Sequence, residues 1–421
     1  MKRAGEFPSS IAASRVATLL RNIRTFKALL RMVHTLVKPT SDAHTLTIPA
    51  PLIKVACTQL ERMEGMDGAK VVVLLTPQLM YFQRPHTNVK RLAVRVQRFI
   101  PEATFPPRLG FIELPYSQGP SLFTNLVIYH EIGHFVYEEL SGQSNGTSPV
   151  DALESARTEC LEAFPELQAE PDIRALAEEM VESWTQEIFC DLFALRLVGP
   201  AFTFALVEIL AMLDSLSRKR TITFDQEHPA PACRFGEHVK LLREDGWWEK
   251  ISHISPEQKM LVERLADIPS TDYKVDEGPE YLLAPFLDKV IPAVRALVRQ
   301  VAPEAAPLAE KFAEERRTIE ECLGVGVVPH TNPPTAALNP VSIINSAFCF
   351  YLTSFPSVVT KFEGENVENN VEIRSKWTKK LEDWTMKAIE DSQVRTQFEG
   401  MQTDGPSKER NSPPDAQPAG R

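Results

Sequence analysis

The chain has 421 residues, of which 46 are Lys or Arg and 56 are Asp or Glu, so its formal net charge at pH 7 is −10. This acidic balance argues against nucleic acid as a partner, because binding to phosphates requires a surplus of basic side chains. The longest apolar stretches, residues 201–213 and 341–359, are interrupted by polar residues or proline. We therefore expect no integral membrane segment.

Six cysteines are spread along the chain without a Cys-x-x-Cys pair. This pattern predicts neither a disulfide framework nor a cysteine-rich zinc site, and it favours a reducing compartment. We therefore expect a cytoplasmic protein. The sequence does not indicate an oligomeric state.

Residues 1–45 form the first predicted element, an amphipathic helix. The first 40 residues contain eight Lys or Arg and only one acid, Glu6. Apolar side chains recur at helical spacing, at Val16, Leu19, Leu20, Ile23, Leu30, Val33 and Val37. We favour a helix that docks this stripe onto the rest of the protein. The alternative is organelle targeting, since transit peptides are Arg-rich and poor in acids.

The next residues predict strands and then helices. Two short apolar segments, 70–76 and 109–114, are typical of strands. They contain β-branched or aromatic residues and have Pro or Gly at their margins. Beyond residue 121 the apolar spacing predicts helices at 122–140, 171–198, 200–216 and 281–301. The sequence therefore predicts an α+β protein that is mostly helical, with its core at 46–323.

A passage rich in Gly and Pro, 324–340, separates this core from a predicted pair of helices. The second helix of the pair places apolar side chains near one face, at Ile373, Trp377, Leu381, Trp384 and Ala388. We therefore assign 324–400 to a linker and a C-terminal helical extension. Residues 401–421 contain four prolines and almost no apolar side chains, so they should form a disordered tail.

The strongest chemical motif is His130-Glu131-Ile132-Gly133-His134, inside the predicted helix 122–140. Two histidines four residues apart lie one turn apart on the same face of a helix, so both imidazoles can reach one Zn²⁺ ion. In this HExxH pattern the intervening Glu131 is expected to act as the general base.

Catalytic zinc requires a third protein ligand. The extended metzincin pattern is excluded, because it needs Gly and His where this chain has Tyr137 and Leu140. The helix 171–198 instead offers Glu187 and Asp191 on one largely apolar face. We expect Glu187 to bind the metal and Asp191 to accept the free ring N–H of one zinc histidine. The alternative is that both acids form surface salt bridges; Glu182, Glu159 and Glu154 are fallback ligands.

A third group is Glu227-His228-Pro229, followed by Arg234. A histidine held by a proline turn can point into a cleft and hydrogen-bond a developing oxyanion. By itself the signal is weak, since a single loop histidine more often faces solvent or caps a helix.

Taken in order, the motifs HExxH, Glu-x-x-small-Asp and His-Pro-x-x-x-x-Arg resemble the gluzincin metallopeptidases, in particular the branch with the CAAX prenyl proteases and the HtpX-like heat-shock proteases. The matching residues are His130, Glu131, His134, Glu187, Cys190, Asp191, His228, Pro229 and Arg234. The resemblance covers about a third of the chain, roughly 110–234. It implies a zincin-type catalytic core with a small edge sheet and helical extensions.

The resemblance also implies roles for individual residues. One zinc ion would be held by His130, His134 and Glu187, with His228 and Arg234 on the substrate side. Arg234, like Asp191, is expected to support the ligands rather than to bind zinc. The strand before the zinc helix would be an edge to which an extended substrate adds as a further strand, through Phe111, Ile112, Glu113 and Leu114.

The sequence thus predicts a zinc-dependent endopeptidase acting on a protein or peptide substrate, with Glu131 as general base and His228 stabilising the oxyanion. One alternative is a zinc-binding protein-interaction module whose peptidase site has decayed. A further alternative is a structural protein in which the histidines satisfy each other in the core.

Overall fold

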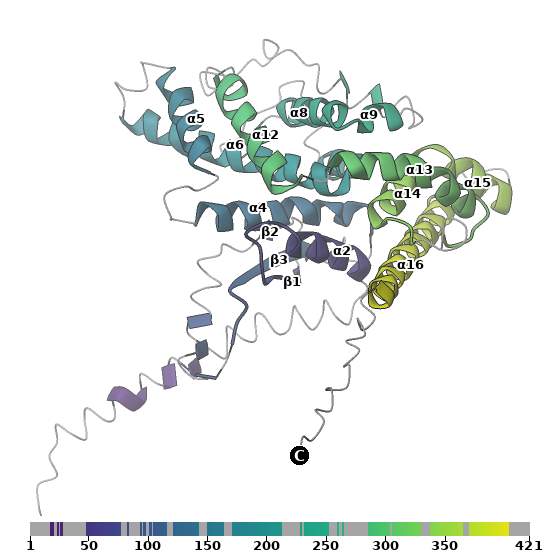
Figure 1. The fold of residues 1–421 in the computed structure, drawn as a ribbon, viewed down its shortest axis with the longest axis horizontal. Coiled ribbons are helices and arrows are strands. Elements are labelled where there is room, and N and C mark those ends of the chain that lie inside the picture. Colours follow the sequence, from purple (N-terminus) through teal and green to yellow (C-terminus); the bar gives the residue numbers. More distant parts are fainter. Residues whose placement is uncertain are drawn as a thin grey trace, which may run out of the picture.

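The structure is a computed structural model, and ten longer segments of it are described. They are residues 48–76, 104–115, 121–142, 150–163, 171–212, 231–251, 285–303, 305–329, 337–364 and 370–403, with short pieces at 17–20, 23–24, 26–27, 82–83, 93–94, 96–97, 101–102, 228–229, 259–260 and 263–264. Helices dominate these segments and a small sheet lies at one side (Figure 1). The prediction of an α+β, mostly helical protein is confirmed.

The sheet has three strands in the order β1-β3-β2. Strand β1 (Ala69–Thr76) pairs in parallel with β3 (Arg108–Pro115), and both lie within one residue of the predicted strands. The two-residue strand β2 (Phe82–Gln83) pairs antiparallel with β3, opposite Glu113 and Ile112.

Strand β3 is therefore the middle strand, and the prediction that Phe111, Ile112, Glu113 and Leu114 form a free edge is wrong. All four side chains are buried. A dipeptide such as Phe82–Gln83 has no alternating pattern that predicts a strand, and its pairing depends on contacts made elsewhere in the fold.

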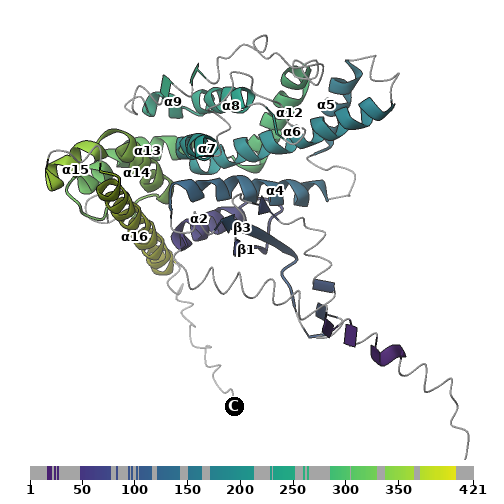
Figure 2. The same ribbon diagram turned by 180° about the vertical axis from the view of Figure 1, so that it is seen from behind.

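The predicted helix 122–140 is divided into a 3₁₀ turn η2 (Thr124–Val127) and helix α4 (Ile128–Ser141). Helix α4 lies between the sheet and the long helix α6 (Pro171–Val198), as both views show (Figures 1 and 2). Against β3 the approach is close: a Cβ built on Gly110 would lie 3.0 Å from the ring of Phe135. Helix α6 has the bounds that the sequence predicts.

The remaining helices surround this pair. They are α2 (Ala50–Glu61), α5 (Asp151–Glu162), α7 (Pro200–Met212), α8 (Pro231–Glu244), α9 (Trp247–Lys250), α12 (Ile291–Val301), which follows the π-helical turn η5 (Phe286–Val290), α13 (Ala305–Gly324), α14 (Pro340–Thr353), α15 (Phe355–Glu363) and α16 (Val371–Thr403). Buried side chains from nearly all of them belong to one hydrophobic core.

The C-terminal extension is part of that core. Asn345 on α14 donates hydrogen bonds to Val198 O (2.7 Å) and Val341 O (2.8 Å), and its Oδ1 accepts one from Ala201 N (2.9 Å). This buried amide ties α14 to the junction of α6 and α7. The residues that the sequence assigned to an extension thus support the helix that carries Glu187.

Helix α16 packs through its predicted face, since Trp377, Leu381 and Ala388 are buried. The same helix reaches the start of the η2–α4 segment, where Glu382 accepts hydrogen bonds from Ser121 Oγ (2.7 Å) and Leu122 N (2.9 Å). A carboxylate is favourable at a helix N-terminus because it satisfies free N–H groups. Residues 401–403 of the predicted tail belong to α16, and 404–421 lie outside the described residues.

Few residues of the predicted N-terminal helix are described, and these are helical. The side chains of Leu19, Leu20 and Ile23 are 58%, 49% and 52% exposed. These three positions therefore do not form the docked stripe that we expected, whereas Val16, Leu30, Val33 and Val37 lie outside the described residues.

Among the described residues, no single helix combines the length and apolar character needed to cross a membrane. Helices α14 and α15 meet both requirements as a pair, but they are bent by 66° at their junction.

Candidate metal centre

The site lies where α4 crosses α6, and Gly133 permits the close approach of these helices. A Cβ built on Gly133 would lie 2.8 Å from Cys190 Cα and 3.1 Å from Cys190 Sγ. The 2.8 Å separation is shorter than real Cβ contacts, so a side chain at this position would force the two helices apart. Gly133 and Cys190, each the fourth residue of its five-residue motif, thus form the helix contact that brings the polar residues of the two motifs together.

We expect Gly133→Ala to lower the free energy of unfolding by about 1–3 kcal/mol, the usual cost of overpacking a tight contact. Chemical denaturation measures this loss. The matched control is Gly142→Ala at the end of the same helix, where the nearest atoms to the added methyl group would be carbonyl oxygens 3.4 Å and 3.7 Å away. Equal stabilities of the two variants would show that the α4–α6 contact tolerates a methyl group.

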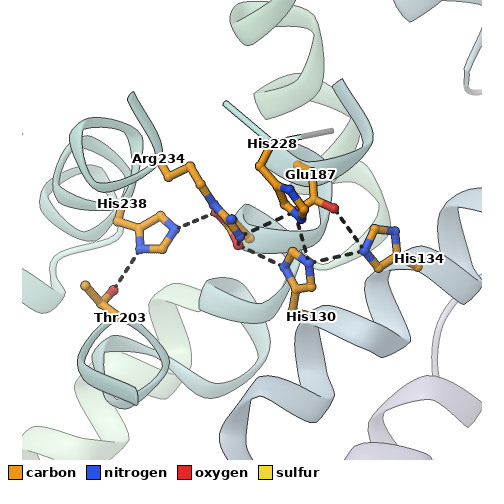
Figure 3. A network of polar contacts seen from close by, with 8 residues as sticks. His130, His134, Glu187, Thr203, His228, Arg234 and His238 are labelled. Atoms are coloured by element: carbon orange, nitrogen blue, oxygen red, sulfur yellow. Dashed lines mark hydrogen bonds and ion pairs between the residues drawn. The ribbon is translucent and has the colours of Figure 1, made fainter. Parts of the chain in front are cut away.

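Three potential ligand side chains converge at this crossing (Figure 3). His130 Nε2 lies 3.2 Å from His134 Nε2. Glu187 places Oε2 3.3 Å from the first nitrogen and Oε1 3.3 Å from the second. Atoms bound tetrahedrally to one ion at about 2.0–2.1 Å lie about 3.3–3.4 Å apart. The three side chains therefore have the mutual spacing of ligands around a single metal ion.

Two further observations fit a cation here. Glu187 Oε2 is buried without a hydrogen-bond partner, which is costly for a carboxylate oxygen. His130 directs Nδ1 at Asp191 Oδ1 (2.9 Å), so Nδ1 carries a proton and, in the neutral imidazole, Nε2 presents its lone pair to the centre.

Cys190 is a further potential ligand. The ligand atoms of His130, His134 and Cys190 all lie within 4.8 Å of one another, so this group could hold a metal ion. Burial raises the pKa of the Cys190 thiol well above its ordinary value, and the charges of Glu187, Asp191 and Glu131 raise it further. The sequence motif used Cys190 only as a small residue, and its thiol was missed as a candidate.

Asp191 lies between His130 and Arg234, on the side of His130 away from His134. Its carboxylate is fully buried and accepts hydrogen bonds from Arg234 Nε (2.6 Å) and Nη2 (2.7 Å) as well as facing His130. Glu187 is also buried, so the alternative of surface salt bridges for these two acids is wrong. Arg234 is buried too, and it lies behind the ligands rather than lining a substrate side.

The charged groups of this cluster shift each other's pKa values in favour of the charged forms. Burial disfavours the charged form of His130, but Glu187 and Asp191 outweigh it and raise the pKa of the imidazole to about 10. Burial likewise opposes ionisation of Glu187, yet His130, His134 and Arg234 hold the pKa of its carboxyl well below the usual value. Arg234 and the neighbouring histidines lower the pKa of Asp191 in the same way, against burial. Without a metal, His130 is therefore an imidazolium held between two carboxylates.

His228 and Glu131 complete the predicted set. His228 precedes α8, and its Nε2 lies 3.9 Å from Glu187 Oε2, with 38% of the side chain exposed (Figure 3). It is thus the histidine of the cluster with the most solvent access. Glu131 is buried in the first turn of α4, close enough for its charge to act on the Cys190 thiol.

The fallback ligands lie elsewhere. Glu182 pairs with Arg157 and accepts a hydrogen bond from Tyr137 (3.4 Å), Glu154 pairs with Arg157 (2.8 Å), and Glu159 faces Ser155 (3.5 Å). In contrast, sequence reasoning missed His238 and Thr203, which extend the polar network beyond Asp191 (Figure 3). The spacing of Arg234 and His238, four residues apart on α8, was the available signal for His238.

Comparison of the chain with protein-family models, with curated proteins and with solved structures found no match. The gluzincin resemblance therefore stays a prediction from the motifs. The functional assignment depends on the residues that the structure brings together.

Proposed function

We propose that this protein is a zinc-dependent endopeptidase. The observation that carries the proposal is the triangle of His130 Nε2, His134 Nε2 and the Glu187 carboxylate, with separations of 3.2–3.3 Å. The two 3.3 Å distances end at different oxygens of Glu187, Oε2 for His130 and Oε1 for His134, so the carboxylate lies across both histidines. His₂Glu is a ligand set used by catalytic zinc in peptidases. Such a set leaves a fourth position for water or substrate.

Two features favour Glu187 over Cys190 as the third ligand. Glu187 places one oxygen near each histidine nitrogen, and its buried Oε2 accepts no hydrogen bond. Cys190 Sγ lies against Gly133, where it fills the contact between α4 and α6. The raised pKa of its thiol also disfavours the thiolate that zinc requires.

The roles of the other residues follow from their positions. Zinc, when bound, supplies Lewis acidity that lowers the pKa of water and polarises a carbonyl oxygen. Glu131, next to a ligand on α4, takes the proton of the attacking water and returns it to the leaving amine. His228, at the exposed side of Glu187, donates a hydrogen bond to the developing oxyanion. Asp191, held by Arg234, keeps His130 oriented with Nε2 toward the centre.

Cleavage of an unstructured protein such as casein tests the proposal, with and without a zinc chelator. We expect cleavage that the chelator abolishes and that added zinc restores. Bound zinc without cleavage of any test protein would favour the alternative of a decayed interaction module. A melting temperature that does not change with zinc would favour histidines that merely satisfy each other, because a ligand that binds only the folded state raises stability.

Comparison of new protein termini made by the wild type and by the Glu131→Gln variant would then identify the substrate. The proposed substrate class is a protein or peptide, and the proposed location is the cytoplasm.

Zinc affinity should increase with pH. Below about pH 10 the zinc-free His130 carries a proton, which must leave before Nε2 can bind metal. One displaced proton corresponds to about a tenfold gain in affinity per pH unit between pH 7 and 9. Competition titrations over that range measure it, and affinity independent of pH would contradict the charge state of His130. Asp191→Asn, which removes one of the two carboxylates that raise this pKa, should flatten the dependence.

The same pKa of His130 predicts that the stability of the zinc-free protein decreases as the pH rises, whereas zinc affinity increases. The folded-state pKa of His130, about 10, lies above the ordinary histidine value of about 6.5. Its protonation therefore contributes stability that is fully present below about pH 6.5 and is lost as the pH rises through 10.

A further inference from the structure

His238 on α8 belongs to none of the motifs, yet it lies in the polar network behind the metal centre (Figure 3). Its side chain is fully buried, with Nε2 3.3 Å from Asp191 Oδ2 and Nδ1 3.2 Å from Thr203 Oγ1. Burying an imidazole is costly unless its nitrogens find polar partners. Burying a phenylalanine or leucine at this position would cost less free energy. The presence of a histidine therefore suggests that its nitrogens interact with polar groups.

Asp191 supplies that explanation. Its Oδ1 faces His130 Nδ1 (2.9 Å) and Arg234 Nη2 (2.7 Å), and its Oδ2 accepts a hydrogen bond from Arg234 Nε (2.6 Å). His238 Nε2 is the remaining group at Oδ2, within ion-pair distance although its alignment falls short of a hydrogen bond. Each oxygen of this fully buried carboxylate therefore faces two donors, and His238 is the fourth.

The surroundings of His238 select its tautomer. The rings of Phe202 and Phe235 each lie 5.6 Å from the imidazole, between centroids, and within the described part of the chain its nitrogens face only Asp191 and Thr203. With the proton on Nε2 toward the carboxylate, Nδ1 accepts the hydroxyl hydrogen of Thr203. Phe202 also lies parallel to the ring of His130, at 6.5 Å and an interplanar angle of 10°.

We infer that His238 is a positioning residue for the zinc site: through Asp191 it holds His130 with the Nδ1 proton toward the carboxylate and Nε2 toward the metal. Thr203 acts one step further, by keeping the proton of His238 on Nε2. This inference rests on the proposed zinc site. Hydrogen-bond partners behind a metal ligand typically change metal affinity by about 10–100-fold when removed.

Two matched pairs of variants in the full chain test the inference. His238→Phe removes the donor at similar size, whereas His238→Gln keeps an amide donor; Thr203→Val removes the hydroxyl at similar shape, whereas Thr203→Ser keeps it. We expect the zinc Kd to rise about tenfold for His238→Phe and a few-fold for Thr203→Val, with the conservative variants within about twofold of wild type. The visible spectrum of the cobalt-substituted protein should change in the first member of each pair.

The melting temperature of each zinc-free variant separates positioning from packing. Phe235→Leu loosens the packing around the same imidazole but retains all four donors to Asp191, so it should lower the melting temperature without changing the zinc Kd. If His238→Phe and Thr203→Val behave in the same way, His238 is a core residue only and the inference is wrong. A wild type that binds no zinc would refute both the site and this role, whereas zinc binding without cleavage would refute the peptidase alone.

Discussion

Glu131→Gln should abolish cleavage while the protein keeps its zinc. The amide has nearly the shape of the carboxylate, but it cannot take a proton from the attacking water. Loss of a general base typically lowers the rate by about 10²–10⁴-fold. Glu131 is not one of the three side chains whose ligand atoms lie 3.2–3.3 Å apart, so the zinc Kd should stay near that of the wild type.

The measurements are kcat with an unstructured protein substrate and zinc content after dialysis. Glu138→Gln is the matched control, because it makes the same change two turns further along α4, one turn beyond His134. It should leave both quantities unchanged. Full activity of Glu131→Gln would contradict its role as general base, and simultaneous loss of zinc would show that Glu131 helps to build the site.

Glu187→Ala is expected to lose zinc altogether under conditions in which the wild type is saturated. It removes the carboxylate that lies 3.3 Å from both histidine nitrogens and leaves only two ligands for the ion. Since loss of a supporting residue already costs about 10–100-fold in metal affinity, loss of a direct ligand should exceed about 100-fold. Activity should disappear together with the metal.

The Cys190→Ala variant distinguishes Glu187 from Cys190 as the third ligand, because His130, His134 and Cys190 also form a group that could hold a metal ion. With Glu187 as the ligand, this variant should keep zinc and activity, since alanine preserves the small residue opposite Gly133. The reverse result, in which Cys190→Ala loses zinc and Glu187→Ala retains it, would assign the third position to sulfur. Melting temperatures of the zinc-free variants show whether each one folds.

Parts of the site were predictable because they depend on local helix geometry. His130 and His134 lie four residues apart in one helix, as do Glu187 and Asp191, and the helical repeat places each pair on one face whatever surrounds it. Burial of these acids was also predictable, because the rest of that helix face is apolar. The relation of His228 to Glu187 followed only from the resemblance, since no local rule connects a loop to a helix forty residues earlier.

The sequence alone therefore identified His130, His134 and Glu187 as candidate ligands and predicted the two helices that carry them. Only the tertiary structure decided that β3 is a middle strand, that the Cys190 thiol lies near both histidines, and that His238 and Thr203 extend the network beyond Asp191. It also decided that α16 meets the start of the η2–α4 segment through Glu382 and Ser121, which are 261 positions apart. The physical reason is that periodicity acts within one turn or one strand, whereas pairing, capping between distant elements and burial depend on contacts that the whole core must form together.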